Sequence, residues 1–358
     1  MNRNPTAEAA YADQNRDLGK SQGVGIFALG AYVPRRVVSN DELAQLVDTS
    51  DGWIKHHLGI HTRYIAADDE TSSDLGLQAL QEACRSARIG LSDVDLLICG
   101  TYTPDHLTPS LASAILRKAG LEDAAGFDVH SGGCPGGVFA LDVGTQYVQS
   151  GRYRTVAIVL ADVSSKIVDW EDRRTCVIMG DGAACYLLRS CRSGTGIVST
   201  SLRSHPAGYY SAYVPAGGRE LPVSAEVLAR REQYFTMTGR EVREFALTRV
   251  PQQIRELVEE NGMELDDIDL FITHQANQKI VHKIMEALGQ PIEKTFTNCE
   301  KFGNTASASV PLAVWEAAEQ GYLRAGSLIV TAAFGSGLNY GATLMRWCEP
   351  GDFFDPAL

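Results

Sequence analysis

The sequence predicts an α/β protein made of two similar halves, and three observations point to that fold class. From Val24 onward, short apolar segments typical of strands alternate with segments of helical periodicity, separated by glycines. The segment LSDVDLLICG at 91–100 recurs in similar form at 265–274 as LDDIDLFITH. A glycine-rich turn within 127–141, between a predicted strand and a predicted helix, carries a cysteine. A duplicated α/β unit accounts for the alternation and the repeat together.

The repeat continues through four elements that keep the same order in both halves. A helix precedes each copy of the repeated strand, at 78–88 in the first half and at 252–261 in the second. The later matches are a helix end, a strand and a closing Gly-x-Gly: Gly151, 156–160 and 180–182 in the first half, and Gly321, 328–332 and 335–337 in the second. Four matches in one order favour duplication over chance.

These patterns divide the chain into three parts. Residues 1–22 are polar and without apolar periodicity, so we expect a flexible N-terminal arm. Residues 23–195 make the first half, which contains the cysteine-bearing turn, and residues 196–350 make the second half.

The composition limits the partners and the compartment. With 358 residues the chain can bury a large core. A net charge of −12 argues against nucleic acid or an anionic membrane as a partner, and no apolar run reaches the ~18 residues of a membrane span. The eight cysteines form no CxxC pair and no metal-like spacing with histidine. We therefore expect reduced thiols in the cytoplasm, no disulfide framework and no metal site.

Cys134 is the residue of greatest chemical interest in the glycine-rich turn. Pro135 follows it at the expected first position of a helix, where the fixed φ of proline fits. The N-terminus of a helix lowers the pKa of a thiol, which predicts a nucleophile. A buried structural cysteine is the alternative, and this turn alone favours neither interpretation.

The duplication places two further residues near Cys134. Asn304 occupies the matching position before the matching helix of the second half, and His274 directly follows the repeated strand. Strand ends and helix starts of open α/β sheets face a common crevice, so the three side chains can converge. Each motif alone would more often be a turn or a helix cap. Their coincidence on one side of the predicted unit favours a catalytic site.

At this point the chain resembles the β-ketoacyl-acyl-carrier-protein synthase III family, from about Gly25 to Trp347. The motifs that carry the resemblance are DGWI at 51–54, GI at 59–60, GGCPGG at 132–137, DR at 172–173, GDGA at 180–183, HQAN at 274–277, GNTASASVP at 303–311 and AFGSG at 333–337. The resemblance implies a thiolase-like fold, in which two pseudo-symmetric α/β halves form a layered α-β-α-β-α core. It also implies a homodimer with a sheet continuous across the two subunits.

The resemblance implies a decarboxylative Claisen condensation of an acyl-CoA with a malonyl thioester, carried by coenzyme A or an acyl carrier protein. Cys134 would take the acyl group as a thioester, and His274 and Asn304 would donate hydrogen bonds to the enolate oxygen of the second thioester. Backbone N–H groups of Cys134 and Ser336 would form the oxyanion hole. Coenzyme A thioesters are substrates here, and no cofactor is implied.

The resemblance also assigns the binding residues. Those implied for coenzyme A and its pantetheine arm are Trp53, Arg173, Gly239 and Asn277, where a guanidinium and an indole can stack on adenine. Burial in the core is the alternative for Trp53. Those implied for the acyl pocket are Thr108, Met179 and Phe334, with Thr108 reaching across the dimer.

Several residues depart from the family's usual pattern. Pro135 and Ser336 replace smaller residues, and Met179 replaces an aromatic residue with an adaptable one. Thr108 replaces the bulky residue that usually closes the acyl pocket, so we expect a longer, branched or cyclic acyl chain rather than acetyl. Glu244 and Glu286 stand where the family usually carries basic residues for docking the carrier protein. Basic residues that could substitute for them are nearby, which leaves docking open: Arg240, Arg243, Lys279 and Lys283. These differences favour polyketide or natural-product chemistry over housekeeping fatty-acid synthesis.

Two other functions on the same fold remain open. The protein could pass the acyl group from Cys134 to an alcohol or amine, although Asn304 beside His274 suits an enolate better. It could instead be a catalytically silent partner subunit, which an intact Cys134, His274 and Asn304 disfavour. A biosynthetic thiolase is disfavoured because the segment at 334–337 lacks a second cysteine.

Overall fold

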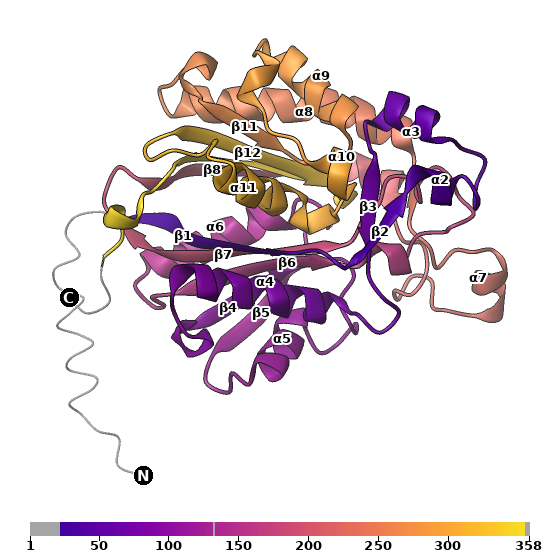
Figure 1. The fold of residues 1–358 in the computed structure, drawn as a ribbon, viewed down its shortest axis with the longest axis horizontal. Helices are drawn as coiled ribbons and strands as arrows, with labels where there is room; N and C mark the ends of the chain where they lie inside the picture. Colours follow the sequence, from indigo (N-terminus) through magenta and orange to yellow (C-terminus); the bar gives the residue numbers. More distant parts are fainter. Residues whose placement is uncertain (1–21, 132, 355–358) are drawn as a thin grey trace.

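In the computed structural model, which describes residues 22–131 and 133–354, five layers alternate between helices and sheets (Figure 1). The strands of the five-stranded sheet, in spatial order, are β1 (Gly23–Tyr32), β7 (Gly182–Cys191), β6 (Val156–Asp162), β4 (Leu96–Gly100) and β5 (Ala125–Val129). Those of the four-stranded sheet are β11 (Leu270–Thr273), β12 (Leu328–Gly335), β13 (Asn339–Arg346) and β8 (Gly196–Ser204). The boundary predicted between 195 and 196 falls between β7 and β8.

The two sheets share one topology, which confirms the duplication predicted from the repeat. In each sheet the first strand, β1 or β8, pairs antiparallel with the last, β7 or β13. That strand pairs antiparallel with β6 or β12, which in turn runs parallel to β4 or β11. The fifth strand of the first sheet, β5, has no full counterpart in the second sheet. At the matching place beside β11, the described residues form one parallel bridge, between Thr295 and Phe271. The second half therefore repeats the first, with one strand reduced to a bridge.

The helices form the outer and middle layers. The middle layer contains α6 (Gly136–Gln149) and α11 (Ser309–Glu319), which pack between the sheets (Figure 1). The outer helices are α4 (Ser72–Ala87) and α5 (Leu111–Ala119) on the first sheet, with α8 (Gly239–Glu260) and α9 (Gln278–Leu288) on the second. Apolar residues of both sheets and both middle helices form one continuous cluster. The predicted layered α-β-α-β-α fold is confirmed.

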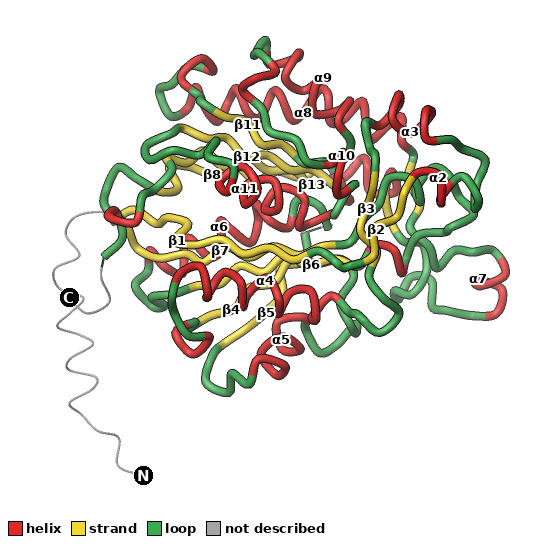
Figure 2. Tube along the Cα trace, in the orientation of Figure 1, coloured by secondary structure: helices red, strands yellow, loops and turns green. Residues whose placement is uncertain are grey.

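Shorter elements gather at one end of the layers (Figure 2). They are β2 (Arg36–Ser39), β3 (Thr62–Ile65), α2 (Asn40–Leu43), α3 (Asp51–Leu58), α10 (Cys299–Phe302), α7 (Ala225–Ala229), β9 (Ala212–Tyr213) and β10 (Thr236–Met237). No helix in the described ranges is both long and apolar enough to cross a bilayer. Residues 1–21 of the predicted arm lie outside the described ranges.

The start of α6 differs by one residue from the prediction. Pro135 is the N-cap of this helix, and Gly136 is its first residue. With φ at −77° and ψ at −3°, Pro135 has helical geometry, and its carbonyl already accepts from Val138 and Phe139. Pro135 therefore accepts the first hydrogen bonds of the helix, as expected, but it does so from the N-cap and not from the first helical position.

Candidate active site

One cavity, of about 750 Å³, brings together the predicted site residues at the shared end of the two halves. Its lining includes Cys134, His274 and Asn304, although these lie far apart in the sequence. Of the other residues implied by the resemblance, those that line it are Trp53, Arg173, Gly239, Asn277, Met179, Phe334 and Ser336. Thr108 alone is not part of this lining and is exposed in its own chain.

Cys134 sits in the turn between β5 and α6, where it is half-buried. Gly133, before it, has φ at 76°, and a Cβ there would lie 3.1 Å from the ring of Tyr102. This close approach needs glycine. Burial, and next the charge of Asp162, raise the pKa of Cys134 to about 12. The predicted lowering of this pKa by the helix is wrong for the free protein, because desolvation outweighs it.

His274 follows β11 and is fully enclosed, with 2% of its surface exposed. Burial lowers its pKa to about 3, so the imidazole is neutral near pH 7. The hydroxyl of Ser309, which begins α11, lies 2.6 Å from Nδ1. If this hydroxyl donates to Nδ1, the proton of the ring is on Nε2, which is then a hydrogen-bond donor. The ring of Phe334 packs edge-on against His274, with centroids 5.1 Å apart.

Asn304 is held by its backbone and by its side-chain oxygen. Its N–H donates to the carbonyl of Ile178 at 2.9 Å, and its carbonyl accepts from Gly180 at 3.0 Å. Its Oδ1 accepts from the N–H of Ala306 at 2.9 Å. This bond assigns the NH₂ group to the other side of the amide and leaves it available to a substrate oxygen. Asn304 and His274 can therefore both donate to one thioester oxygen without changing their protonation.

The Ser336 loop is connected to the nucleophile turn. Ser336 follows β12 and is half-buried, and Gly337 after it has φ at 122°. The side-chain amide of Asn339 donates to the carbonyl of Ser131 at 3.2 Å, which joins this loop to the turn of Cys134. The two segments implied for the oxyanion hole are thus in direct contact.

Trp53 and Arg173 meet at the mouth of the cavity. The guanidinium carbon of Arg173 lies 4.5 Å from the centroid of the indole. The ring of His57 stacks on the same indole, also at 4.5 Å. Arg173 donates to the backbone carbonyl of Asp48 at 2.6 Å, which holds the guanidinium in place. Trp53 is half-buried: it lines the cavity and also packs against the apolar core, so it combines a core contact with a place at the mouth.

Asn277 caps a helix and also lies in the cavity lining. Its Oδ1 accepts from the N–H of Ile280 at 3.0 Å, so it is the N-cap of α9. It also lines the cavity. The cap directs the start of the helix toward the space where the pantetheine arm is expected.

Positive side chains surround the mouth of this cavity. The basic residues in its lining, besides Arg173, are Arg174, Arg243, Lys279 and Lys283. Arg174 pairs with Asp172 at 2.7 Å, and Lys283 lies 3.8 Å from Glu286. Within the described part of the chain, no carboxylate lies within 4.0 Å of Arg243 or Lys279. These two cations are therefore free to meet an anionic group.

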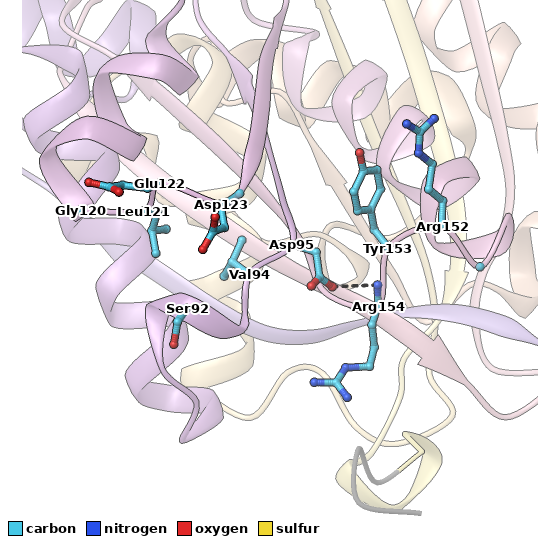
Figure 3. Close-up of a pocket in the computed structure, with 12 residues that line it drawn as sticks. Ser92, Val94, Asp95, Gly120, Leu121, Glu122, Asp123, Arg152, Tyr153 and Arg154 are labelled. Atoms are coloured by element: carbon cyan, nitrogen blue, oxygen red, sulfur yellow. Dashed lines mark hydrogen bonds between the residues drawn. The ribbon is translucent and has the colours of Figure 1, made fainter. Parts of the chain in front are cut away.

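A larger cavity, of about 830 Å³, lies at the opposite end of the first half (Figure 3). Its lining comes from 92–95, 120–124 and 151–154, which precede β4, β5 and β6, whereas the site residues follow strands. It combines acidic and basic side chains, and Asp95 at its centre accepts from the backbone of Arg154 at 2.9 Å. It contains none of the predicted site residues, so the smaller cavity is the candidate active site.

Comparison with known proteins gives a consistent result. The model of 3-oxoacyl-[acyl-carrier-protein] synthase III matches residues 127–206, and the model of its C-terminal part matches residues 258–347. The β-ketoacyl-[acyl-carrier-protein] synthase III of Symbiobacterium thermophilum is 40% identical over 328 residues, which cover 92% of this chain and 99% of that protein. The chain belongs to the β-ketoacyl-acyl-carrier-protein synthase III family. The recognition drawn from its motifs is confirmed.

Solved structures of this synthase family have the same fold as this chain. The 3-oxoacyl-[acyl-carrier-protein] synthase III from Aquifex aeolicus VF5 is 34% identical with a TM-score of 0.84, covering 91% of this chain and 100% of its own. The priming β-ketosynthase from the R1128 polyketide biosynthetic pathway is 28% identical with a TM-score of 0.85, covering 92% and 98%. This fold is therefore shared by a 3-oxoacyl-[acyl-carrier-protein] synthase III and by a priming ketosynthase of a polyketide pathway.

Three residues near the site were not found by reading the sequence. Ser309 contacts His274, and the ring of Tyr102 packs beside Gly133 in the turn of Cys134. The carboxylate of Asp162 accepts a hydrogen bond from the N–H of Tyr102. The available signal was weak: Asp162 ends a buried strand, and Ser309 lies in the same small-residue segment as Asn304. A polar residue at the end of a strand or at the start of a helix is more often a cap or part of a turn, so these two signals do not identify Asp162 or Ser309 as functional.

Proposed function

We propose that this protein condenses an acyl group, taken from coenzyme A, with a decarboxylating malonyl thioester. The observation that carries this proposal is the convergence of Cys134, His274 and Asn304 on one cavity. A thiol can accept an acyl group, and two neutral donors can stabilise an enolate. The condensing activity agrees with the membership of the synthase III family.

In the first step, the sulfur of Cys134 attacks the acyl carbon of the thioester. A bond forms between that carbon and Sγ, the bond to the coenzyme A sulfur breaks, and the thiol proton ends on the departing coenzyme A. The backbone N–H groups of Cys134 and Ser336 would hold the tetrahedral oxyanion. The reaction exchanges one thioester for another, so no cofactor is required to drive it.

In the second step, a malonyl thioester binds with its carbonyl oxygen between His274 and Asn304. Loss of carbon dioxide leaves an enolate, whose charge the Nε2–H of His274 and the NH₂ of Asn304 stabilise. The enolate carbon forms a bond with the acyl carbon on Cys134, and the bond between that carbon and Sγ breaks. The sulfur of Cys134 leaves as a thiolate and takes one proton from solvent. Because His274 is neutral, it donates a hydrogen bond throughout without giving up its proton.

The mouth of the cavity supports coenzyme A as the carrier of the acyl group. Trp53 and Arg173 supply an indole and a guanidinium in contact with each other at this mouth, and both are groups that stack on adenine. Arg243 and Lys279 offer unpaired charge to the phosphates of coenzyme A and to an acidic carrier protein that delivers the malonyl group. Glu286 is close enough to Lys283 to reduce its contribution to docking.

The assembly and the location are part of the same proposal. β5 is at the edge of its sheet, so its outer backbone groups can pair with β5 of a second copy to form a homodimer. Thr108 would then reach the acyl pocket of the partner. The free cysteines and the use of coenzyme A are suited to the cytoplasm.

The test is a product assay with a panel of acyl-CoA thioesters, including acetyl, branched and octanoyl groups. Each is combined with malonyl-CoA or with malonyl-loaded carrier protein, and carbon dioxide and the β-ketoacyl product are measured. We expect both products from the native protein, and no β-ketoacyl product from Cys134→Ala. Transfer of the acyl group only to added alcohols or amines would replace this proposal with an acyltransferase. No reaction with any thioester would favour a silent partner subunit.

A further inference from the structure

Asp162 is a buried carboxylate that the proposed reaction does not use directly. It is the last residue of β6 and has no exposed surface. Its Oδ1 accepts from the hydroxyl of Thr101 at 2.8 Å, from the N–H of Tyr102 at 2.9 Å, and from the hydroxyl and N–H of Thr103 at 2.9 and 3.2 Å. Its Oδ2 accepts from the N–H and hydroxyl of Ser307 at 3.0 and 2.5 Å. Three of these donors are backbone N–H groups, which only an acceptor can satisfy.

The two oxygens bind different halves of the protein. The residues on Oδ1, 101–103, follow β4 in the first half, whereas Ser307 on Oδ2 belongs to the second half. The hydrogen bonds between Asp162 and Ser307 join positions 145 apart in the sequence. One carboxylate therefore connects the two halves directly beside the active site.

The Oδ2 side reaches the groups that bind the malonyl thioester. Ser307 lies between Asn304 and Ser309 in one continuous segment. Asn304 supplies one of the two enolate donors, and Ser309 contacts the ring of His274, which supplies the other. A shift of Ser307 would therefore move Asn304 and change the support of His274 together.

The Oδ1 side reaches the nucleophile. Tyr102 lines the cavity, and its ring occupies the space beside Gly133 in the turn of Cys134. The phenol of Tyr102 donates to the hydroxyl of Ser164 at 2.7 Å, so the ring is held at both ends. The same carboxylate thus holds Tyr102, whose ring packs against the turn that carries Cys134.

We propose that Asp162 is a positioning residue that sets the spacing between Cys134 and the His274–Asn304 pair by holding both halves through one carboxylate. The inference rests on the proposed condensation. The inference extends the proposed condensation because it assigns a role to a residue that touches no substrate. The malonyl step depends on this spacing most, because its enolate carbon must reach the acyl group across the cavity.

Asp181 provides a matched control. It is also fully buried, and it accepts from Ala66 at 2.8 Å and from the N–H and hydroxyl of Ser165 at 2.9 and 2.5 Å. These side-chain bonds all stay within the first half and reach neither Asn304 nor Ser309. Replacing Asp181 therefore tests the cost of losing a buried carboxylate whose own hydrogen bonds do not cross between the halves. The backbone beside it does cross, since Gly180 donates to Asn304, so the ratio of the two half-reactions is the readout and not the total activity.

The experiment compares Asp162→Asn with Asp181→Asn. Asparagine keeps one oxygen for the donors of the first half, but places an NH₂ against the N–H of Ser307. For Asp162→Asn we expect the rate of malonyl decarboxylation and condensation to fall at least about tenfold. Single-turnover acylation of Cys134 should not slow by more than about threefold, because loss of the Asp162 charge favours the thiolate. For Asp181→Asn we expect the two half-reactions to keep their native ratio, even if the melting temperature falls.

The variant Ser307→Ala removes only the hydroxyl on Oδ2 and gives a second test if Asp162→Asn does not fold. We expect a selective loss in the malonyl step, in the same direction and smaller. An unchanged ratio of the two half-reactions in the folded variants would overturn the role of Asp162. Failure of the native protein to acylate or condense would instead overturn the proposed function, so the two failures are distinguishable.

Discussion

At the scale of single residues, the nucleophile and its neighbour are both uncharged in the free protein. Burial raises the pKa of Cys134 and lowers that of His274, so the resting site holds a thiol and a neutral imidazole. If the proton moved from Cys134 to His274, the imidazole would become a charged imidazolium and could no longer act as a neutral hydrogen-bond donor. The neutral pair leaves Nε2 free to donate to an enolate, provided that Ser309 donates to Nδ1.

The raised pKa of Cys134 predicts how alkylation depends on pH. Only the thiolate reacts with iodoacetamide, and a pKa of about 12 keeps it scarce through the working range. We expect the alkylation rate of Cys134, followed by peptide mass spectrometry, to rise about tenfold per pH unit from pH 7 to 10. A rate that levels off below pH 8 would contradict the effect of burial. Cys134→Ala controls for reaction at the other thiols.

Ser309 gives a second prediction, because it selects the tautomer of His274. Ser309→Ala removes the hydroxyl 2.6 Å from Nδ1, so the ring loses both its orientation and its preferred proton position. We expect kcat of the malonyl step to fall about tenfold, equivalent to roughly 1.4 kcal/mol, with little change in KM. Ser309→Thr keeps the hydroxyl and should retain most activity. Equal kcat in the native protein and Ser309→Ala would refute this role.

At the scale of elements, we expect the segment between β4 and α5 to determine which acyl group fits in the proposed dimer. It contains Thr108, which is exposed in its own chain, and Leu107, with 84% of its surface exposed. An apolar side chain this exposed, beside a residue expected to reach across a dimer, is consistent with a contact made only in the assembly. The length of the acyl chain should therefore depend on the size of residue 108.

Thr108→Phe tests that dependence. The larger ring should fill the end of the acyl pocket and shift preference toward acetyl-CoA. We expect the ratio of kcat/KM for octanoyl-CoA to that for acetyl-CoA to fall at least about tenfold, in line with the cost of removing room for several methylenes. Thr108→Ser should leave the ratio near that of the native protein. An unchanged ratio in Thr108→Phe would place the end of the pocket elsewhere.

The sequence predicted the three central residues because the duplication relates them locally. Cys134 and Asn304 each precede the middle helix of their half, and His274 follows a repeated strand, so pattern alone brings them to one end of the sheets. Ser309 and Asp162 act through contacts 35 and 145 positions apart, which no local pattern records. The pKa of Cys134 was missed for a related reason, because desolvation depends on the whole surrounding cavity.

At the scale of the whole molecule, the two halves close around one cavity, and β5 forms an open edge of the five-stranded sheet. β5 ends the order of the five-stranded sheet. Natural proteins usually cover or blunt such an edge, and pairing with a second copy is one way to do so. The position of Thr108 outside its own cavity is consistent with the same assembly.

Light scattering and hydrogen exchange test this assembly. We expect a mass close to twice 38.8 kDa at micromolar concentration, with amides of β5 protected from exchange. On dilution, loss of that protection should accompany loss of specific activity, because Thr108 would no longer reach the partner's pocket. A monomer with full activity would contradict both the dimer and the role of Thr108.

Acylation of Cys134 is the most direct test of the catalytic account. The protein is mixed with an acyl-CoA, weighed intact, and weighed again after a malonyl thioester is added. We expect one acyl adduct per chain, absent in Cys134→Ala, and we expect the malonyl thioester to discharge it with release of carbon dioxide and a β-keto product. In His274→Ala the adduct should form and persist, because the enolate has lost a donor. An adduct that survives in Cys134→Ala, or that the malonyl thioester leaves in place on the native protein, would contradict the account.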